Sequence, residues 1–237
     1  MARAEVPLLA VLIDADNVLA RNAEAILKEV TTYGEPALRR VYGDWSNPQL
    51  NAWKEKARTL GLVAHQQSAN TKGKNASDIG LVIDAMDILH AGKFDGFVLV
   101  SSDSDFTRLA SRIREDGLEV IGIGEAKTPE ALRNVCNRFV FIENIVEEAE
   151  PAKGAVTKSE SKRPPAEATP LIIRAMDKID QEDDWYLLGL IGQRIVADNP
   201  DFDTRTYGKR KLSDLVAELK RFETKRVGNQ LYVRRVD

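Results

Sequence analysis

Cysteine and histidine are scarce in this sequence of 237 residues. Cys136 is the one cysteine, and His65 and His90 are the two histidines. A single thiol cannot form an internal disulfide or a cysteine-rich zinc site. Neither histidine has a partner for a catalytic triad nearby in the sequence, so we expect both to be structural. The lone thiol fits a reducing compartment, and we expect a cytoplasmic protein.

Long apolar runs are also missing. The first apolar run, Leu8–Ile13, is interrupted by Asp14 and Asp16, so it predicts neither a signal peptide nor a membrane span. No other stretch is long enough to cross a bilayer, and we expect no contact with membranes. The length and the 43% hydrophobic content allow one large domain and a small one. The net charge of -3 by itself argues neither for nor against nucleic acid.

Apolar runs and helix-period segments alternate from Leu8 to about Ile145. Strands are predicted at Leu8–Ile13, Leu38–Tyr42, Leu62–His65, Phe97–Val100, Glu119–Ile123 and Phe139–Ile142. Helices are predicted at Ala20–Tyr33, Pro48–Leu60, Ala76–His90, Phe106–Glu115 and Pro129–Cys136. Nearly continuous apolar strands separated by helices are typical of α/β proteins, in which a parallel sheet is covered on both faces.

The composition changes at Glu147. From Glu147 to about Ala168, Pro, Lys, Glu, Ser and Ala dominate, which predicts a flexible linker. Beyond it, helices are predicted at Leu171–Ile179, Leu187–Val196 and Leu212–Phe222, and Gly228-Asn229 predicts a hairpin within Val227–Arg234. Three helices and a terminal hairpin are typical of a winged helix-turn-helix. We therefore expect a domain at 1–146, a linker at 147–168 and a smaller winged-helix-like domain at 169–237.

Aspartates follow the predicted strand ends. An open parallel sheet binds its ligands outside the carboxyl ends of its strands. Two aspartates end the first strand, one follows the second, two follow the strand Phe97–Val100, and one opens a helix. These residues are Asp14, Asp16, Asp44, Asp103, Asp105 and Asp78. Several carboxylates are thus expected at one edge of the sheet.

Crowded carboxylates repel one another, and a divalent cation is the simplest reason for them to coexist. Magnesium prefers carboxylate and water oxygens. Held between aspartates, it can orient a water, lower the pKa of that water and neutralise charge on a scissile phosphate. The alternative is that these aspartates only cap helices or begin turns. Asp105, for example, could be the N-cap of the helix that begins at Phe106.

Three neighbours of the predicted site have weaker assignments. Asp84 lies six residues beyond Asp78, off its helical face, and we expect it to support the structure. Lys72 and Lys74 lie in a polar segment before Asp78. They could contact phosphates of a substrate or simply be solvated, and the sequence does not decide between the two.

Apart from Asp44, the aspartates of the predicted site lie in three short segments: Ile13-Asp14-Ala15-Asp16-Asn17, Lys74-Asn75-Ala76-Ser77-Asp78 and Ser101-Ser102-Asp103-Ser104-Asp105-Phe106. In their order and rough spacing, these segments resemble the NYN domain family of PIN-like nucleases. The resemblance covers about Leu8 to Glu143. It implies a doubly wound sheet and RNA cleavage that depends on Mg²⁺ or Mn²⁺ and leaves a 5′-phosphate end. Some members of the family bind RNA without cutting it.

The resemblance also implies roles for individual residues. Asp14, Asp78 and Asp103 would be both catalytic residues and metal ligands. Asp105 would complete the catalytic acidic cluster, and Asn17 would hold a ligand or a phosphate of the substrate. Asp16 falls at a position that varies in this family, so the resemblance assigns it no role.

The second domain contains three characteristic segments: Phe202-Asp203-Thr204-Arg205-Thr206-Tyr207-Gly208, Lys211-Leu212-Ser213-Asp214-Leu215 and Gly228-Asn229-Gln230-Leu231-Tyr232-Val233-Arg234. On these segments the domain resembles LOTUS domains, also called OST-HTH domains, from about Leu171 to Val236. It implies RNA binding and allows a protein partner. It predicts no particular oligomeric state.

The charge of this segment agrees independently with a polyanionic partner. Residues 205–235 contain ten Lys or Arg residues and three Asp or Glu residues, a net charge of +7. The densest basic group is Arg205, Lys209, Arg210 and Lys211. We expect this group to bind RNA.

Three aromatic residues of the second domain have assignments of their own. Tyr207 and Tyr232 could stack on bases. In the alternative, Tyr207 fills the small core and the charged side chains are only solvated. Trp185 is expected to anchor the core of the domain.

Three functions are compatible with these patterns. The first is a metal-dependent ribonuclease with an RNA-binding module, acting on single-stranded or structured RNA. The second is an RNA-binding adaptor without catalysis. The third is a phosphatase of the haloacid dehalogenase type, with Asp14 as nucleophile, Asp16 as acid/base and Ser101 in a second motif. The third explains neither Asp103 and Asp105 directly after that serine nor the basic second domain.

Overall fold

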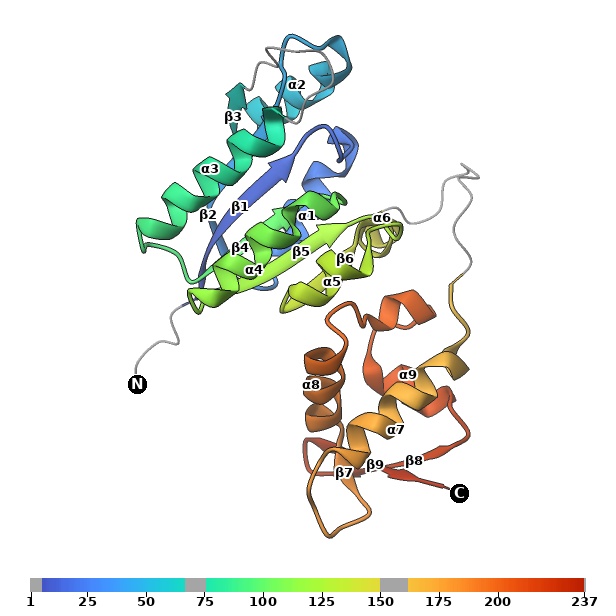
Figure 1. Cartoon of the computed structure of the whole chain (residues 1–237). Helices are drawn as coiled ribbons and strands as arrows, with labels where there is room; N and C mark the ends of the chain where they lie inside the picture. The colour runs from blue at the N-terminus through green and yellow to red at the C-terminus, as the bar shows by residue number, and fades with distance from the viewer. Residues whose placement is uncertain (1–5, 67–75, 150–161, 237) are drawn as a thin grey trace, which may run out of the picture. The chain divides into compact units, whose positions relative to one another are not determined.

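The computed structural model describes residues 6–66, 76–149 and 162–236 (Figure 1). The chain divides into two compact units, Met1–Pro151 and Ala152–Asp237, which we call unit 1 and unit 2. Each unit has its own hydrophobic core.

Unit 1 is built on a sheet of six parallel strands in the order β3-β2-β1-β4-β5-β6 (Figure 1). The strands are β1 Leu8–Asp14, β2 Glu35–Gly43, β3 Val63–Gln66, β4 Gly96–Val100, β5 Glu119–Gly124 and β6 Arg138–Phe141. The chain runs outward from β1 to β3 and then returns to β4 beside β1 before it continues to β6. The order of the strands therefore reverses between β1 and β4, which confirms the predicted doubly wound α/β sheet.

Six α-helices of the described residues accompany this sheet. They are α1 Ala23–Val30, α2 Asn51–Leu60, α3 Ala76–His90, α4 Thr107–Glu115, α5 Glu130–Val135 and α6 Ile142–Ala149. Short 3-10 turns precede three of them and take up residues that the sequence pattern assigns to the helices: η1 Ala20–Asn22, η2 Pro48–Leu50 and η3 Ser104–Phe106. The sequence predicts α3 with its observed bounds. It does not predict α6, whose Ile142 and Ile145 are both buried.

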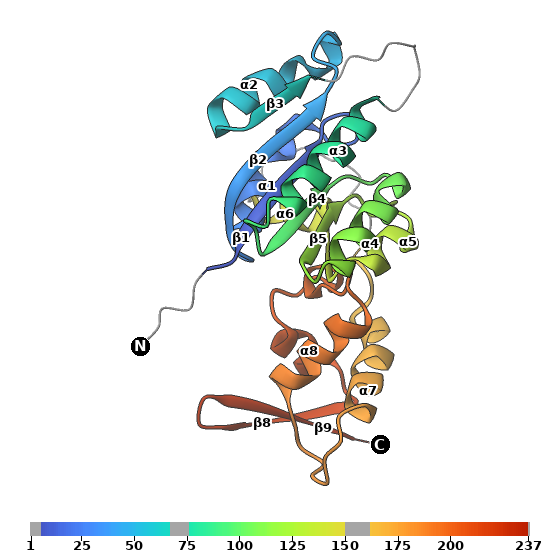
Figure 2. The same ribbon diagram turned by 60° about the vertical axis from the view of Figure 1, so that its left-hand side comes forward.

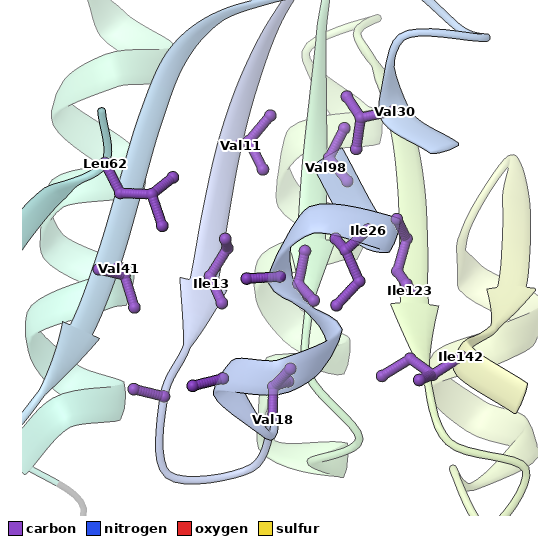
Figure 3. Packing of buried hydrophobic residues seen from close by; sticks show 14 of the residues in the cluster. Val11, Ile13, Val18, Ile26, Val30, Val41, Leu62, Val98, Ile123 and Ile142 are labelled. Carbon is purple, nitrogen blue, oxygen red and sulfur yellow. The ribbon is translucent and has the colours of Figure 1, made fainter. Parts of the chain in front are cut away.

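The sheet of unit 1 has a hydrophobic core on each face. Side chains of β1 alternate between the two, so that Val11 and Ile13 belong to one cluster and Ala10 and Leu12 to the other. The first cluster includes residues of α1, α2 and α6, and Figure 3 shows the close packing of β1, β4 and α1 within it. The second cluster includes residues of α3, α4 and α5. With both faces covered, polar chemistry is confined to the ends of the strands.

Unit 2 combines helices with a small antiparallel sheet in the order β7-β9-β8. Its elements are η4 Pro165–Ala168, α7 Thr169–Asp177, β7 Tyr186–Leu187, α8 Leu188–Asp198, η5 Thr204–Tyr207, α9 Leu212–Glu218, β8 Phe222–Val227 and β9 Gln230–Arg235. The hairpin β8–β9 turns at Gly228, whose φ is 58°. That left-handed conformation favours glycine and explains the turn that the sequence predicts.

Three predictions for unit 2 and for the linker before it need correction. The helix predicted to reach Phe222 ends at Glu218, and Phe222 begins β8 instead. The short strand β7 was not predicted. The predicted linker 147–168 is helical at both ends, because α6 reaches Ala149 and η4 spans Pro165–Ala168. In the part of the chain that the structure describes, we find no helix with the length and hydropathy needed to traverse a membrane.

Candidate active site

The carboxyl end of β1 carries Asp14 to the point where the strand order reverses. Its side chain is 1% exposed. Oδ2 accepts hydrogen bonds from Asn17 Nδ2 at 2.7 Å and from Ser101 Oγ at 2.8 Å, and Oδ1 accepts one from the backbone N–H of Asp16 at 3.1 Å. Burial raises the pKa of Asp14, while the hydrogen bonds from Asn17 and Ser101 lower it. The Asp14 carboxylate is thus buried, oriented by three donors and held at the functional edge of the sheet.

The segment after β4 brings a second group of polar residues to the same edge. Ser101 and Ser102 are buried, and Ser101 Oγ, which donates to Asp14, accepts the backbone N–H of Asp103 at 3.1 Å. One hydroxyl therefore connects the strand ends of β1 and β4. The nuclease interpretation of the sequence missed this role of Ser101. The available signal was a serine directly after an apolar strand.

Asp103 also begins the 3-10 turn η3. Its Oδ1 accepts the backbone N–H of Asp105 at 2.9 Å, so Asp103 is the N-cap of this turn. The suggestion that Asp105 is the N-cap is therefore wrong. Asp105 lies inside the turn and is exposed. Capping by Asp103 uses one lone pair of one oxygen and leaves acceptor capacity on this carboxylate.

Asp78 lies in the first turn of α3 and experiences the charges of the other aspartates. Burial is the largest cause that raises the pKa of Asp78. The charges of Asp14, Asp103, Asp16 and Asp105 raise this pKa further, to about 6. Like charges raise the pKa of a carboxyl only when they are near it. The structure therefore brings carboxylates from β1, α3 and the β4–α4 connection within electrostatic reach of one another.

The aspartates at this edge of the sheet do not form a ready-made metal site in the described part of the chain. Within residues 6–66, 76–149 and 162–236, no set of three acidic, histidine or cysteine side chains is placed to hold one metal ion. The structure thus does not assemble Asp14, Asp78 and Asp103 into a closed set of ligands. Two of the three are turned toward donors of their own loops, as described above. The chemistry of the group nevertheless suits a hard cation, because its members are oxygen donors whose negative charges oppose one another.

Two other aspartates have different tasks. Asp44, after β2, accepts hydrogen bonds from Ser46 and from Gln66 Nε2, and these bonds lower its pKa. Asp84, in the middle of α3, pairs with Arg40 and accepts a hydrogen bond from the hydroxyl of Tyr42. These bonds lower the pKa of Asp84 in spite of its partial burial. Asp84 therefore supports the structure, as the sequence predicts.

The predicted phosphate-binding residues are only partly described. Asn17 lies beside Asp14 and donates to it, so its amide orients that carboxylate. Lys72 and Lys74 lie outside the described residues.

The predicted basic group of unit 2 is largely engaged within the fold. Arg205 pairs with the buried Asp203 through Nη2 at 2.7 Å and Nε at 2.9 Å, and Lys209 pairs with Glu218. Tyr207 is 6% exposed and belongs to the core of unit 2. The structure therefore favours the alternative in which Tyr207 fills the core, since a buried ring cannot stack on a base. Arg210 and Lys211 are exposed at the surface.

Trp185 does not anchor the core of unit 2, contrary to the prediction. It is half-buried and is not part of the buried cluster of this unit. Instead, Lys225 Nζ lies 4.1 Å and Arg234 Cζ 4.8 Å from the centroid of its ring. The reason is its position directly before β7. The next residue, Tyr186, takes the core side of the strand and packs against that cluster.

Comparisons with known proteins match both units. The family model of the NYN domain matches residues 8–143, and that of the OST-HTH/LOTUS domain matches residues 159–233. No match was found among curated proteins. Since the NYN match includes the segment from Asp14 to Leu19, the haloacid dehalogenase interpretation of that segment loses its support.

A solved structure resembles part of the chain in fold. A protein of unknown function from Vibrio parahaemolyticus superposes with a TM-score of 0.50 and 22% identity, covering 60% of this chain and 96% of that one. At this identity the likeness concerns the fold alone. MurG from Acinetobacter baumannii gives a TM-score of 0.39 and 12% identity, covering 90% of this chain and 70% of that one. This second likeness is too low to support any argument.

Proposed function

Because the chain belongs to the NYN domain family, we propose that it is a metal-dependent ribonuclease that hydrolyses phosphodiester bonds of RNA. One observation carries the proposal: Asp78 is partly buried near the charges of four other aspartates, and its burial together with the charges of Asp14, Asp103, Asp16 and Asp105 raises its pKa to about 6. This repulsion costs stability in the folded protein. Strain of this kind is typical of functional sites, where carboxylates gather around a cation or a reacting group.

In this proposal the divalent cation, Mg²⁺ or Mn²⁺, is held by Asp14, Asp78 and Asp103. When bound, it supplies a water of lowered pKa and neutralises charge on the scissile phosphate. Ser101 and Asn17 orient the Asp14 carboxylate by donating to Oδ2, and Ser101 also holds the backbone of Asp103. Asp105 adds negative charge at the exposed rim of the site.

The second unit supports RNA as the substrate. Its match to the OST-HTH/LOTUS model and the net charge of +7 over residues 205–235 both favour a polyanionic partner. In our proposal this unit binds the RNA that unit 1 cleaves. We further expect the protein to act in the cytoplasm.

The experiment is an incubation of the purified chain with labelled single-stranded RNA in Mg²⁺, in Mn²⁺ or in chelator. We expect shortened products with a divalent cation and intact RNA with chelator. Products should carry 5′-phosphate ends, which are detected by their susceptibility to a 5′-phosphate-dependent exonuclease. Cutting that continues in chelator would contradict the metal-dependent mechanism.

The second candidate function is an RNA-binding adaptor. It is favoured by the finding that the described side chains do not include a ready set of three metal ligands. The same experiment separates the two functions. The adaptor predicts RNA binding without products in either metal, whereas the nuclease predicts products that vanish when the cation is removed.

A further inference from the structure

The sheet of unit 2 has two different faces. Phe222 and Val233 are buried in the core, and Tyr186 packs against them from β7. Successive residues of a strand point to opposite faces, so the residues between these lie on the other side. We call that side the outer sheet face. It carries Trp185, Leu187, Glu223, Lys225, Tyr232 and Arg234. Figure 2 shows α7 and α8 together on one side of the hairpin β8–β9.

Two aromatic rings lie on the outer sheet face. Trp185 and Tyr232 are both half-buried, and neither is part of the buried cluster of unit 2. The Tyr232 hydroxyl contacts Gln230 Oε1 at 2.8 Å on the same strand. A domain of this size buries only a small apolar area on folding. Stability alone therefore does not explain why two large aromatic rings lie outside its core.

Cations lie directly beside these rings. Lys225 Nζ is 4.1 Å and Arg234 Cζ 4.8 Å from the centroid of the Trp185 ring. Arg234 also pairs with Glu223 at 2.5 Å. Cation–π contacts at exposed sites are weak, so a base or a phosphate can replace them. The cations are thus kept next to the aromatic rings while remaining available to a ligand.

We propose that the outer sheet face binds single-stranded RNA. Unpaired bases stack on Trp185 and Tyr232, and Lys225 and Arg234 contact the phosphates of the same strand. Aromatic rings interleaved with cations suit single strands, because every base has a π face and every linkage has a charge. A duplex keeps its bases stacked inside the helix and cannot use the rings. The choice of RNA as the nucleic acid rests on the proposed function.

The surrounding charge favours this face over the basic group near Arg205. Residues 220–235 contain six Lys or Arg residues and one Glu, a net charge of +5. Lys225 is exposed and Arg234 half-exposed. Arg205, in contrast, is held by the buried Asp203, whereas Arg234 pairs with the exposed Glu223. An ion pair to an exposed carboxylate is exchanged for a phosphate more readily than one to a buried carboxylate, so Arg234 is better able than Arg205 to contact RNA.

The test is fluorescence anisotropy of the full-length chain with labelled single-stranded oligouridine, measured in chelator so that binding is separated from cleavage. We expect Trp185→Ala and Tyr232→Ala each to raise Kd about tenfold. Trp185→Phe keeps an aromatic face and should stay within about threefold of the wild type. A labelled RNA duplex of equal length should bind less tightly than oligouridine. Circular dichroism verifies that each variant is folded.

A matched pair of charge reversals tests the face itself. Lys225 lies on the outer sheet face, and its exposed neighbour Arg226 lies on the opposite side of the same strand. Lys225→Glu should raise Kd about tenfold at low salt and reduce the slope of log Kd against log salt by about one. Arg226→Glu makes the same change in net charge and should have a clearly smaller effect.

Three results would overturn the inference. They are wild-type affinity in both aromatic-to-alanine variants, equal losses from Lys225→Glu and Arg226→Glu, and no binding of oligouridine by the wild type. None of them bears on cleavage by unit 1, which is measured separately with divalent cations. Conversely, the expected binding pattern without any metal-dependent cleavage would support the outer sheet face and contradict the ribonuclease.

Discussion

The two sheets of this chain place their polar chemistry in different locations. The parallel sheet of unit 1 is covered by apolar clusters on both faces, so only the strand ends are available, and there the aspartates meet. The antiparallel sheet of unit 2 has the core of that unit on one face, while its outer sheet face carries aromatic rings and cations. A strand end brings together a few residues from distant segments. A free sheet face instead offers a continuous surface for a long ligand.

The two units also differ in how much their charged side chains destabilise the fold. In unit 1, like charges near one another are partly buried, and Asp14 is almost fully so. In unit 2, the cations of the outer sheet face are near the surface, where water screens them. Unit 1 therefore resembles a reaction centre, and unit 2 a binding surface.

Removing an aspartate charge from unit 1 should abolish catalysis and leave binding by unit 2 intact. We expect Asp14→Asn and Asp103→Asn each to lower the cleavage rate about 1,000-fold or more, because a cation loses a charged ligand. The affinity for oligouridine in chelator should change less than twofold. Asp116→Asn, outside the site on the surface after α4, is the matched control and should cut RNA normally. Unchanged cleavage by the Asp14 or Asp103 variant would contradict the assigned site.

The serine that connects β1 to β4 should matter more than its neighbour. Ser101→Ala removes the donor to Asp14 and the acceptor of the Asp103 N–H. Cleavage should fall about 10- to 100-fold, as for other groups that orient metal ligands. Ser102→Ala, which instead loses an acceptor for the N–H of Glu125, should stay within about threefold.

Varying the concentration of Mn²⁺ identifies the cause of the Ser101 effect. If Ser101 orients a ligand, its loss should raise the metal concentration that gives half-maximal rate. Equal losses in the two serine variants would point to general destabilisation of the loop instead.

In unit 2, one of the predicted RNA-binding residues should act on stability. Arg205→Ala leaves the buried Asp203 without its ion-pair partner, and unfolding should become easier by about 1–2 kcal/mol. RNA affinity should stay within about threefold, since Arg205 is engaged within the fold. Thermal unfolding and anisotropy measure the two effects. A large loss of RNA affinity in a variant of unchanged stability would instead indicate that RNA binds at the basic group of Arg205, Lys209, Arg210 and Lys211.

The smallest expected effect concerns the stability of unit 1. The pKa of Asp78 is raised to about 6 in the folded chain, against an ordinary value of 3.8. Above pH 6 the folded state therefore bears the full cost of this charge. Between pH 6 and 3.8 the folded state takes up the proton before the unfolded state does, so stability increases as the pH falls.

Asp78→Asn removes this pH-dependent cost. We expect this variant to be about 1 kcal/mol more stable than the wild type at pH 7.5 in chelator. This figure is reduced to allow for the partial exposure of Asp78, where water screens the charge. The advantage should disappear at pH 4, where the wild-type carboxyl is largely protonated in the folded state. Urea denaturation at the two pH values measures the difference. A variant that is less stable than the wild type at pH 7.5 would mean that Asp78 makes favourable contacts that outweigh the repulsion.

Most of unit 1 could be predicted from the sequence because its strands are nearly continuous apolar runs and several of its helices are followed by a glycine. The helix Ala76–His90 and the glycine that ends α2, Gly61 with a φ of 64°, were found from these patterns. The placement of Asp14, Asp78 and Asp103 at one edge follows from the direction of parallel strands. The distances among their oxygens do not follow, because they depend on side-chain rotamers and loop hydrogen bonds.

Unit 2 shows where pattern analysis reaches its limit. A strand of two residues, β7, is too short to display alternation, so the outward position of Trp185 could not be predicted. Tyr207 stands in a basic segment and suggests a ligand contact, yet its ring fills the core. Aromatic residues are amphipathic, and only the tertiary fold decides which of their ends meets water.

The anchor in the middle of α3 has a consequence for the position of Asp78. Asp84 ties this helix to Arg40 and Tyr42 on β2, six residues beyond Asp78. At 1.5 Å per residue, the anchor lies about 9 Å along the helix axis from Asp78. A change that loosened α3 from β2 would therefore shift Asp78 relative to Asp14 without touching either aspartate.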